Sequence, residues 1–258
     1  MKKILIIAGI ALLFSTAFSQ SADQIMDGVV EAQKADSSAM DIRMTLYDRE
    51  KAEGTRRIQT LVLDEEGLTK TITVFLEPAS VRDTRFLTLE NPDRGDDQWI
   101  YLPALRKIKR IAAGEKSGSF MGSDFSYSDM SSSIGPVDDS SHRLIREEVL
   151  DGRNCWVVES VPGPGAQSDY GKYISWVDKE TSLTARVDFY GKKDNQVVKR
   201  LLSEDFTETA GRWYAKRISM ETLATGHRTV LEMAQVRYNI PVNPAFFTTT
   251  FLETGRAR

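Results

Sequence analysis

Residues 96–111 read DDQWIYLPALRKIKRI, which places an aromatic segment, a proline turn and a basic segment in immediate succession. Because successive side chains of a strand point to opposite faces, Trp99 and Tyr101 are expected on one face of the first segment. Residues 120–130 follow as FMGSDFSYSDM, where Met and aromatic side chains stand among glycine and serine. The first stretch predicts an antiparallel hairpin, and the second predicts a loop that carries apolar side chains.

The strand pattern of this hairpin extends over most of the chain. It begins where Met40, Ile42, Met44 and Leu46 alternate with polar residues. Further candidate strands, separated by turn residues, cover 55–63, 69–77, 84–90, 98–102, 107–111, 142–150, 155–161, 173–178, 184–190, 197–206, 213–222 and 229–238. We expect about eleven strands in sequential hairpins, and hence a mainly β protein with one antiparallel sheet. A flat sheet of that width would expose an apolar face and two edges, so it is expected to curl into a half-open barrel.

One helix is expected before the sheet. Ser21 and Gln24 form a capping-box pattern, and Ile25 and Val29 recur at helical spacing. A half-open barrel of about eleven strands is wider than its own side chains can fill, so a helix or a ligand must occupy its concave face. We therefore expect helices to plug or cover that face, with this early helix as the first candidate.

Residues 1–19 carry the pattern of a signal peptide, with two lysines, a short apolar run and a cleavage site before Gln20. One domain is then expected to cover residues 20–258. Cys155 is the only cysteine of the chain, so neither an internal disulfide nor a lipid anchor at the cleavage site is expected. These features predict a protein that is released into the periplasm without a lipid anchor.

Composition and residue types argue against several classes of function. The formal net charge of −3 disfavours a general nucleic-acid binder. The two histidines, His142 and His227, lie beside arginines in expected strands, and no cysteine cluster, zinc-binding helix or G-x-S-x-G motif occurs. We expect no metal, no cofactor and no catalytic residue. A lipid-ester hydrolase that uses Ser123 or Ser126 with His142 is the less favoured alternative.

A basic segment follows the aromatic strand. Arg106, Lys107, Lys109 and Arg110 place positive charge on both faces of the expected strand. Such a run can protect a sheet edge from pairing with another chain. Beside an aromatic hairpin in a secreted protein, it also suits docking to acidic headgroups or to an acidic partner. We predict that these four residues form a docking surface for a membrane or a partner protein.

Apolar positions in the expected strands and loop are the candidate ligand contacts. Alternation on the strands gives two sets of side chains, and the pattern leaves open which set faces inward. The loop at 120–130 combines flexible backbone with Met and aromatic side chains, which suits an adaptable apolar lid. The candidate contacts are Met44, Leu46, Val74, Leu76, Trp99, Tyr101, Phe120, Met121, Phe125 and Tyr127.

With these residues in view, the chain resembles the outer-membrane lipoprotein-sorting family, the LolA-like periplasmic carriers. Within that family it is most similar to the branch that accompanies inner-membrane exporters of the resistance-nodulation-division type. The segments at 96–111 and 120–130 carry the resemblance, and the signal peptide, early helix and strand meander agree with it. The resemblance implies a half-open antiparallel barrel with helices across its mouth. It also implies a lid held by an arginine early in the barrel, for which Arg43 is a candidate.

The resemblance and the residues together predict a carrier. It would bind acyl chains of lipoproteins or other lipids in an apolar cavity and move them from an inner-membrane exporter toward the outer membrane. Each buried methylene contributes about 0.8 kcal/mol, so an acyl chain can be bound without a catalytic group. A carrier of this kind is most simply a monomer. The alternative is a non-carrying regulatory subunit of the exporter, which a tightly filled barrel would favour.

Overall fold

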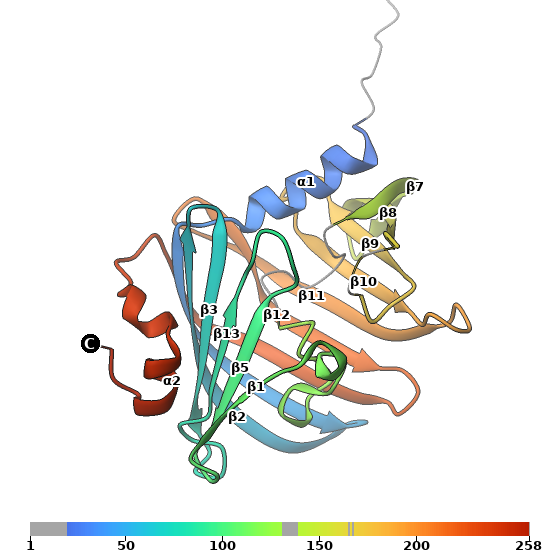
Figure 1. Cartoon of the computed structure of the whole chain (residues 1–258). Helices are drawn as coiled ribbons and strands as arrows, with labels where there is room; N and C mark the ends of the chain where they lie inside the picture. Colours follow the sequence, from blue (N-terminus) through green and yellow to red (C-terminus); the bar gives the residue numbers. More distant parts are fainter. Residues whose placement is uncertain (1–19, 131–138, 165, 167, 258) are drawn as a thin grey trace, which may run out of the picture.

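The computed structural model describes residues 20–130, 139–164, 166 and 168–257, so the expected signal peptide at 1–19 lies outside the described residues. Within this part of the chain, the strands join one antiparallel sheet that curls without closing (Figure 1). Its 13 strands are β1 (Ser37–Asp48), β2 (Lys51–Glu65), β3 (Leu68–Glu77), β4 (Arg85–Leu89), β5 (Asp97–Leu102), β6 (Lys107–Arg110), β7 (Ser140–Leu150), β8 (Arg153–Pro162), β9 (Lys172–Asp178), β10 (Thr184–Tyr190), β11 (Val197–Thr209), β12 (Arg212–Thr222) and β13 (His227–Tyr238).

The order of the strands across the sheet is β6-β5-β4-β3-β2-β1-β13-β12-β11-β10-β9-β8-β7. The first and last strands pair at its centre, where Ser38 lies opposite Tyr238 and Asp48 lies opposite His227. The sheet is therefore two meanders, β1–β6 and β7–β13, joined along this central pair. The prediction of a mainly β, half-open antiparallel barrel is confirmed. The sheet has 13 strands, one for each candidate segment named above, whereas about eleven were expected.

The concave face of the sheet is closed over by a segment of the chain itself. Residues 112–130, which we call the strap, lie within the curl of the sheet (Figure 1). They contain two short 3₁₀ turns, η1 (Ala113–Glu115) and η2 (Phe120–Gly122). Phe120 and Phe125 are fully buried in one cluster with side chains from β1–β5 and β9–β13. We call this cluster the interior cluster.

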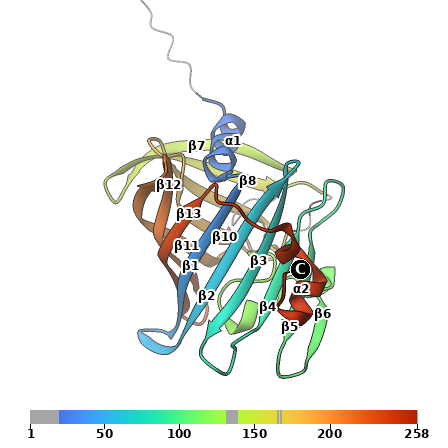
Figure 2. The same cartoon turned by 90° about the vertical axis from the view of Figure 1, so that its left-hand side faces the viewer.

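The early helix forms as predicted. In α1 (Ala22–Gln33), Ser21 Oγ accepts a hydrogen bond from the Gln24 backbone N–H at 3.1 Å, and Gln24 Oε1 accepts one from the Ser21 N–H at 3.0 Å. Its buried residues Ile25, Met26 and Val29 pack against β8 and β9. The helix lies across one end of the barrel (Figure 2). It covers the mouth beside β7–β9, while the strap fills the middle of the concave face.

The C-terminal segment packs on the outside of the sheet. A 3₁₀ turn, η3 (Pro244–Phe247), leads into α2 (Thr249–Thr254), which lies against the outer face of the β1–β6 meander (Figure 2). Phe251 and Leu252 contact an apolar set on β2–β6 that includes Ile72 and Leu87. The expectation that helices cover the concave face therefore holds for α1, whereas α2 covers the convex face. In the described part of the chain, no helix combines the length and apolar character that a bilayer crossing requires.

Candidate functional site

The apolar interior beneath the strap is the candidate site. The Phe120 ring lies at the centre of an aromatic group, with ring centroids 5.0 Å from Phe86, 5.7 Å from Tyr127 and 5.9 Å from Phe75. Tilted and edge-on ring pairs at these separations stabilise a core beyond the area that they bury. The strap therefore occupies, with its own aromatic side chains, the surface on which an apolar ligand would lie.

A tight turn presents the two phenylalanines of the strap to the sheet. Met121 and Gly122 have left-handed backbone angles, with φ of 53° and 77°. Glycine adopts this conformation without strain, so Gly122 supports the turn. The Phe120 N–H donates to the Phe125 carbonyl at 2.7 Å, and Ser123 Oγ donates to the Phe120 carbonyl at 2.7 Å. The turn thus holds both rings on the same side of the strap.

Asp124 ties the strap to the β7–β13 meander. Its buried carboxylate accepts hydrogen bonds from Thr222 Oγ1 at 2.6 Å and Thr229 Oγ1 at 2.7 Å, and it lies 2.7 Å from His227 Nδ1. The Asp124 N–H also donates to Thr229 Oγ1 at 3.0 Å. Thr222 ends β12 and His227 begins β13. One carboxylate therefore fixes the strap to the β12–β13 hairpin, next to the centre of the sheet.

Asp129 makes the second connection to that meander. Its carboxylate lies 3.3 Å from Lys199 Nζ on β11 and accepts a hydrogen bond from the Tyr170 hydroxyl at 3.4 Å. It also accepts the Ser126 backbone N–H at 2.7 Å, which orders the strap itself. Burial raises the pKa of Tyr170, and the nearby Asp129 adds to this shift. The phenol therefore keeps its proton and remains a donor to Asp129.

The strap is tied to the β1–β6 meander on its other side. Gln98 Nε2 on β5 donates to the Tyr127 carbonyl at 2.8 Å, and Lys116 Nζ donates to the Asp96 carbonyl at 2.7 Å. Burial raises the pKa of Tyr127. The strap thus bridges the two meanders. Each of these hydrogen bonds or ion pairs between the strap and the sheet involves at least one side chain.

The structure divides the predicted strand contacts between the two faces of the sheet. Met44 and Leu46 are buried in the interior cluster, beneath the strap. Val74, Trp99 and Tyr101 belong to the outer apolar set that contacts the C-terminal segment. Leu76 lies where the pairing of β3 with β2 shifts register, between Phe75 and Glu77, so strand alternation does not assign it to either face. The four strap residues, Phe120, Met121, Phe125 and Tyr127, all belong to the interior cluster or pack against it. Ligand binding by any of these residues stays a prediction.

The four predicted docking residues differ in their pairing. Lys109 Nζ lies 2.7 Å from Glu115, and Arg110 pairs with Asp97. Hydrogen bonds from Arg94 and Arg110 hold the pKa of the Asp97 carboxyl well below its usual range, so this anion persists.

The other two docking residues lie at the end of the β5–β6 hairpin. Arg106 and Lys107 are exposed, and among the described residues neither has an ion-pair partner. Leu105 beside them is 63% exposed. Sequence reasoning did not single out Leu105.

The hydrolase residues do not meet. His142 Nδ1 lies 2.7 Å from Ser160 Oγ on the neighbouring strand. Ser123 Oγ donates to a carbonyl of the strap, and Ser126 Oγ accepts the Asp129 N–H at 3.1 Å. Each of these groups has a local partner, so the structure gives no arrangement in which His142 activates either serine.

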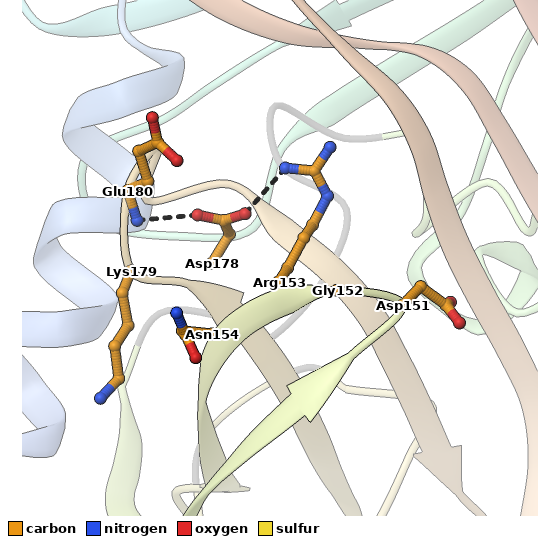
Figure 3. Close-up of a pocket in the computed structure, with 7 residues that line it drawn as sticks. All are labelled: Asp151, Gly152, Arg153, Asn154, Asp178, Lys179 and Glu180. Atoms are coloured by element: carbon orange, nitrogen blue, oxygen red, sulfur yellow. Dashed lines mark hydrogen bonds and ion pairs between the residues drawn. The ribbon is translucent and has the colours of Figure 1, made fainter.

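Two surface cavities are lined mainly by polar and charged groups. The first, of about 340 Å³, is shown in Figure 3, where Asp178 accepts a hydrogen bond from Arg153 at 2.9 Å. Its lining residues are Asp151, Gly152, Arg153, Asn154, Asp178, Lys179 and Glu180. The second, of about 840 Å³, includes the exposed Arg43 in its wall. Arg43 alternates with Ile42 and Met44 of the interior cluster, so it points away from the strap. Charged side chains stand in the walls of both cavities, which does not suit an acyl chain.

Sequence reasoning missed the groups that hold the strap. Asp124, Asp129 and His227 are central to it, and Thr222, Thr229, Tyr170 and Lys199 complete the contacts. One signal was present: two aspartates, five residues apart, stand among the aromatic residues of the strap. Carboxylates in an apolar segment need buried partners.

The comparisons with known proteins agree with this architecture. A family model described as "-like: Uncharacterized protein" matches residues 67–254. A protein of the DUF1329 family from Desulfovibrio piger is 28% identical with a TM-score of 0.83, over 91% of this chain and 100% of that chain. A Vibrio parahaemolyticus structure, described as an outer membrane lipoprotein-sorting protein domain, is 28% identical with a TM-score of 0.82, over 90% of this chain and 98% of that chain.

A third solved structure has the same fold at lower identity. It is a LolA superfamily protein from Nitrosomonas europaea, 22% identical with a TM-score of 0.70, over 90% of this chain and 100% of that chain. Among curated proteins, none matches the sequence. The family model spans well over half of the chain, and the structural neighbours share its curled sheet. The chain therefore belongs to the family that this model describes, and it is similar in fold to the outer membrane lipoprotein-sorting and LolA superfamily structures.

Proposed function

We propose that the protein is a periplasmic carrier that binds acyl chains of lipoproteins or other lipids on the concave face of its sheet. It would receive them from an inner-membrane exporter and move them toward the outer membrane. The observation that supports this most directly is the way the strap is attached. The backbone–backbone hydrogen bonds of residues 113–130 run within the strap, and side chains make its hydrogen bonds to the sheet.

A segment attached in this way can leave the sheet as a unit. No strand pairing has to break, since the ladders of β1–β13 do not include the strap. Its departure would uncover Met44, Leu46 and Phe75, which are apolar and now buried. An acyl chain that covers the same surface gains about 0.8 kcal/mol for each buried methylene. The strap then acts as a lid that the cargo displaces.

The two faces of the sheet would have different roles in such a carrier. Contacts with cargo are assigned to Met44 and Leu46 and to the strap residues Phe120, Met121, Phe125 and Tyr127. Val74, Trp99 and Tyr101 face the other way, and we propose that they hold the C-terminal segment in place.

A non-carrying regulatory subunit is the second candidate. One observation favours it: the strap already fills the concave face, and Phe120 and Phe125 are fully buried. Uptake of a lipid probe distinguishes the two candidates, because a regulator of this kind has no reason to exchange its own core for an acyl chain.

Probe uptake is predicted to depend on the inner face of the sheet. The purified protein should bind a fluorescent long-chain acyl probe, in competition with long-chain lipids and without hydrolysing esters. Leu46→Gln should weaken binding about tenfold, because it places an amide on the apolar surface beneath the strap. Leu61→Gln is the matched control, since Leu61 is a partly buried leucine of the outer apolar set, and this variant should bind like the wild type. Uptake is measured by fluorescence titration after circular dichroism has shown that each variant folds.

Two results would contradict this prediction. Absence of uptake by the wild type would favour the regulatory subunit. Equal effects of the two substitutions would show that the probe does not lie on the concave face.

Docking is predicted to depend on the end of the β5–β6 hairpin. We propose that Arg106 and Lys107, with the exposed Leu105 between the strands, meet an acidic membrane surface or the exporter beside it. The double substitution Arg106→Glu and Lys107→Glu should abolish sedimentation with vesicles of phosphatidylglycerol and phosphatidylcholine. The double substitution Lys109→Glu and Arg110→Glu makes the same change of charge, but it removes cations that already have ion-pair partners. It should therefore reduce sedimentation with the vesicles less. Wild-type binding should fall as salt is added.

A larger loss from the second pair would place the docking surface on the strand instead of its turn. Equal binding of both variants and the wild type at low salt would rule out docking by this segment. Both variants should keep the melting temperature of the wild type within a few degrees, because exposed charges contribute little to folding.

A further inference from the structure

Arg56 is a charged side chain at the border of the apolar interior. It lies on β2 opposite Met44 of β1 and two residues before Ile58, and both of these belong to the interior cluster. Its Nη1 lies 3.9 Å from Met44 Sδ, and its guanidinium carbon lies 6.0 Å from the centroid of the Phe75 ring. Met44 and Phe75 are fully buried. The guanidinium is thus in contact with the surface that the strap covers.

Arg56 differs from its neighbour Arg57 in pairing. Arg57 points outward, lies 3.5 Å from Asp41 and stands opposite Glu77 on β3. For Arg56, no carboxylate lies within 4.0 Å among the described residues. Burial lowers the pKa of Arg56. A half-buried guanidinium without an anion has lost part of its hydration and has not replaced it by a charge of opposite sign.

Open space adjoins this guanidinium. Gly54 lies two residues before Arg56, on the same face of β2 and opposite Leu46. A Cβ placed at Gly54 would have no atom within 4 Å. Leu46 pairs on its other side with Thr229, the residue that holds Asp124 of the strap. The strap therefore occupies the Thr229 side of this row, while the Gly54 side, beside Arg56, is open.

We infer that Arg56 binds the anionic group of an amphiphilic cargo, a carboxylate or a phosphate, whose acyl chain lies beneath the strap. This inference rests on the proposed carrier function and names the class of its cargo. The flat guanidinium offers a fork of N–H donors that matches both anions. The anion would stay at the open end of the concave face near water, and the chain would extend from it over Met44 and Phe75.

The test compares probes that differ only in charge. A fluorescent long-chain fatty acid and its methyl ester are titrated into the wild type, Arg56→Gln, Arg56→Lys and the matched control Arg57→Gln. The wild type should bind the acid about tenfold more tightly than the ester. Arg56→Gln should bind the acid about tenfold more weakly and the ester unchanged, which removes the preference. Arg56→Lys should keep part of the preference, and Arg57→Gln should keep all of it.

Competitors identify the anion and its attachment. Dodecyl phosphate should displace the acid from the wild type if phosphate is accepted, and failure to do so restricts the cargo to carboxylates. Inorganic phosphate should not displace it, because the chain supplies most of the affinity. Displacement by inorganic phosphate as effective as by dodecyl phosphate would overturn the inference in favour of a simple anion site. The melting temperature of Arg56→Gln should equal or exceed that of the wild type, since an unpaired charge has been removed.

The inference and the carrier function fail in different ways. Equal binding of acid and ester, unchanged in Arg56→Gln, overturns the role of Arg56 and leaves the carrier intact. Binding of neither probe by the wild type overturns both. A marked fall in the melting temperature of Arg56→Gln together with weaker binding of both probes would show that Arg56 is structural.

Discussion

Replacing Asp124 with alanine is expected to release the strap from the centre of the sheet. The substitution removes the acceptor of Thr222 and Thr229 and the partner of His227, three groups of the β12–β13 hairpin. Buried donors left without an acceptor should lower the free energy of unfolding by about 3 kcal/mol in total. Amide hydrogens of the strap should then exchange much faster than those of the strands, and the acyl probe should enter faster. Hydrogen exchange followed by mass spectrometry measures the first effect, and stopped-flow fluorescence measures the second.

Asp48→Ala is the matched control for this substitution. Asp48 is exposed and lies opposite His227 in the β1–β13 pair. Its replacement therefore removes a carboxylate from the same region of the sheet without removing a hydrogen bond to the strap. Its stability and strap exchange should stay close to those of the wild type. If Asp124→Ala left the exchange of the strap as slow as before, the aspartate would not be what holds it, and Asp129 or Gln98 would be the next residue to replace.

Phe120→Ala should weaken folding and strengthen probe binding in the same molecule. Its ring is fully buried among Phe75, Phe86 and Tyr127, and loss of such a ring lowers the free energy of unfolding by about 3–5 kcal/mol. The space left lies on the concave face, where an acyl chain can fill it. Probe at about 100 times its Kd should return about 2.7 kcal/mol of this loss. Thermal melts with and without probe measure both changes.

Phe251→Ala provides the comparison on the other side of the sheet. Phe251 is also a buried aromatic residue, but it packs on the outer face with the C-terminal segment. Its removal should lower stability by a similar mechanism, and the probe should not restore it. If the probe restored the stability of both variants, its binding would not be confined to the concave face. If it restored the stability of neither variant, the result would argue against an acyl site beneath the strap.

The strands could be predicted because side chains alternate with a period of two along each of them, and this alternation is visible in the local sequence. The sequence did not allow us to predict which face of each strand lies on the concave side of the sheet. In the β1–β6 meander both faces are covered, one by the strap and the other by the C-terminal segment. Trp99 and Ile100, on opposite faces, are therefore both partly or fully buried. Alternation between two apolar sets carries no information about which set is concave.

The strap could be recognised as apolar, but its role as the filling of the barrel could not be read from local sequence. A helix was expected there because α1 has a capping box and helical spacing, which are local signals. The strap is ordered instead by Asp124 and Thr229, which are 105 residues apart. The ion pairs of the basic segment could not be predicted for the same reason, because they depend on the fold and not on local sequence. Its partners Asp97 and Glu115 lie on either side of it, and only the fold shows that Lys109 and Arg110 meet them.

The pairing of β1 with β13 sets the order in which the molecule can fold. Within each meander, neighbouring strands are close in sequence and can pair early, because short loops close at little entropic cost. The central pair joins Ser38 to Tyr238, almost the full length of the described chain, and contacts of such long range form slowly. Until β13 is in place, the two meanders do not share a concave face, and the strap has nothing on which to pack. Closure of the barrel interior is therefore expected among the last events in folding. A chain that lacks β13 should retain two separate half-sheets, in which β1 and β12 become additional unpaired edge strands.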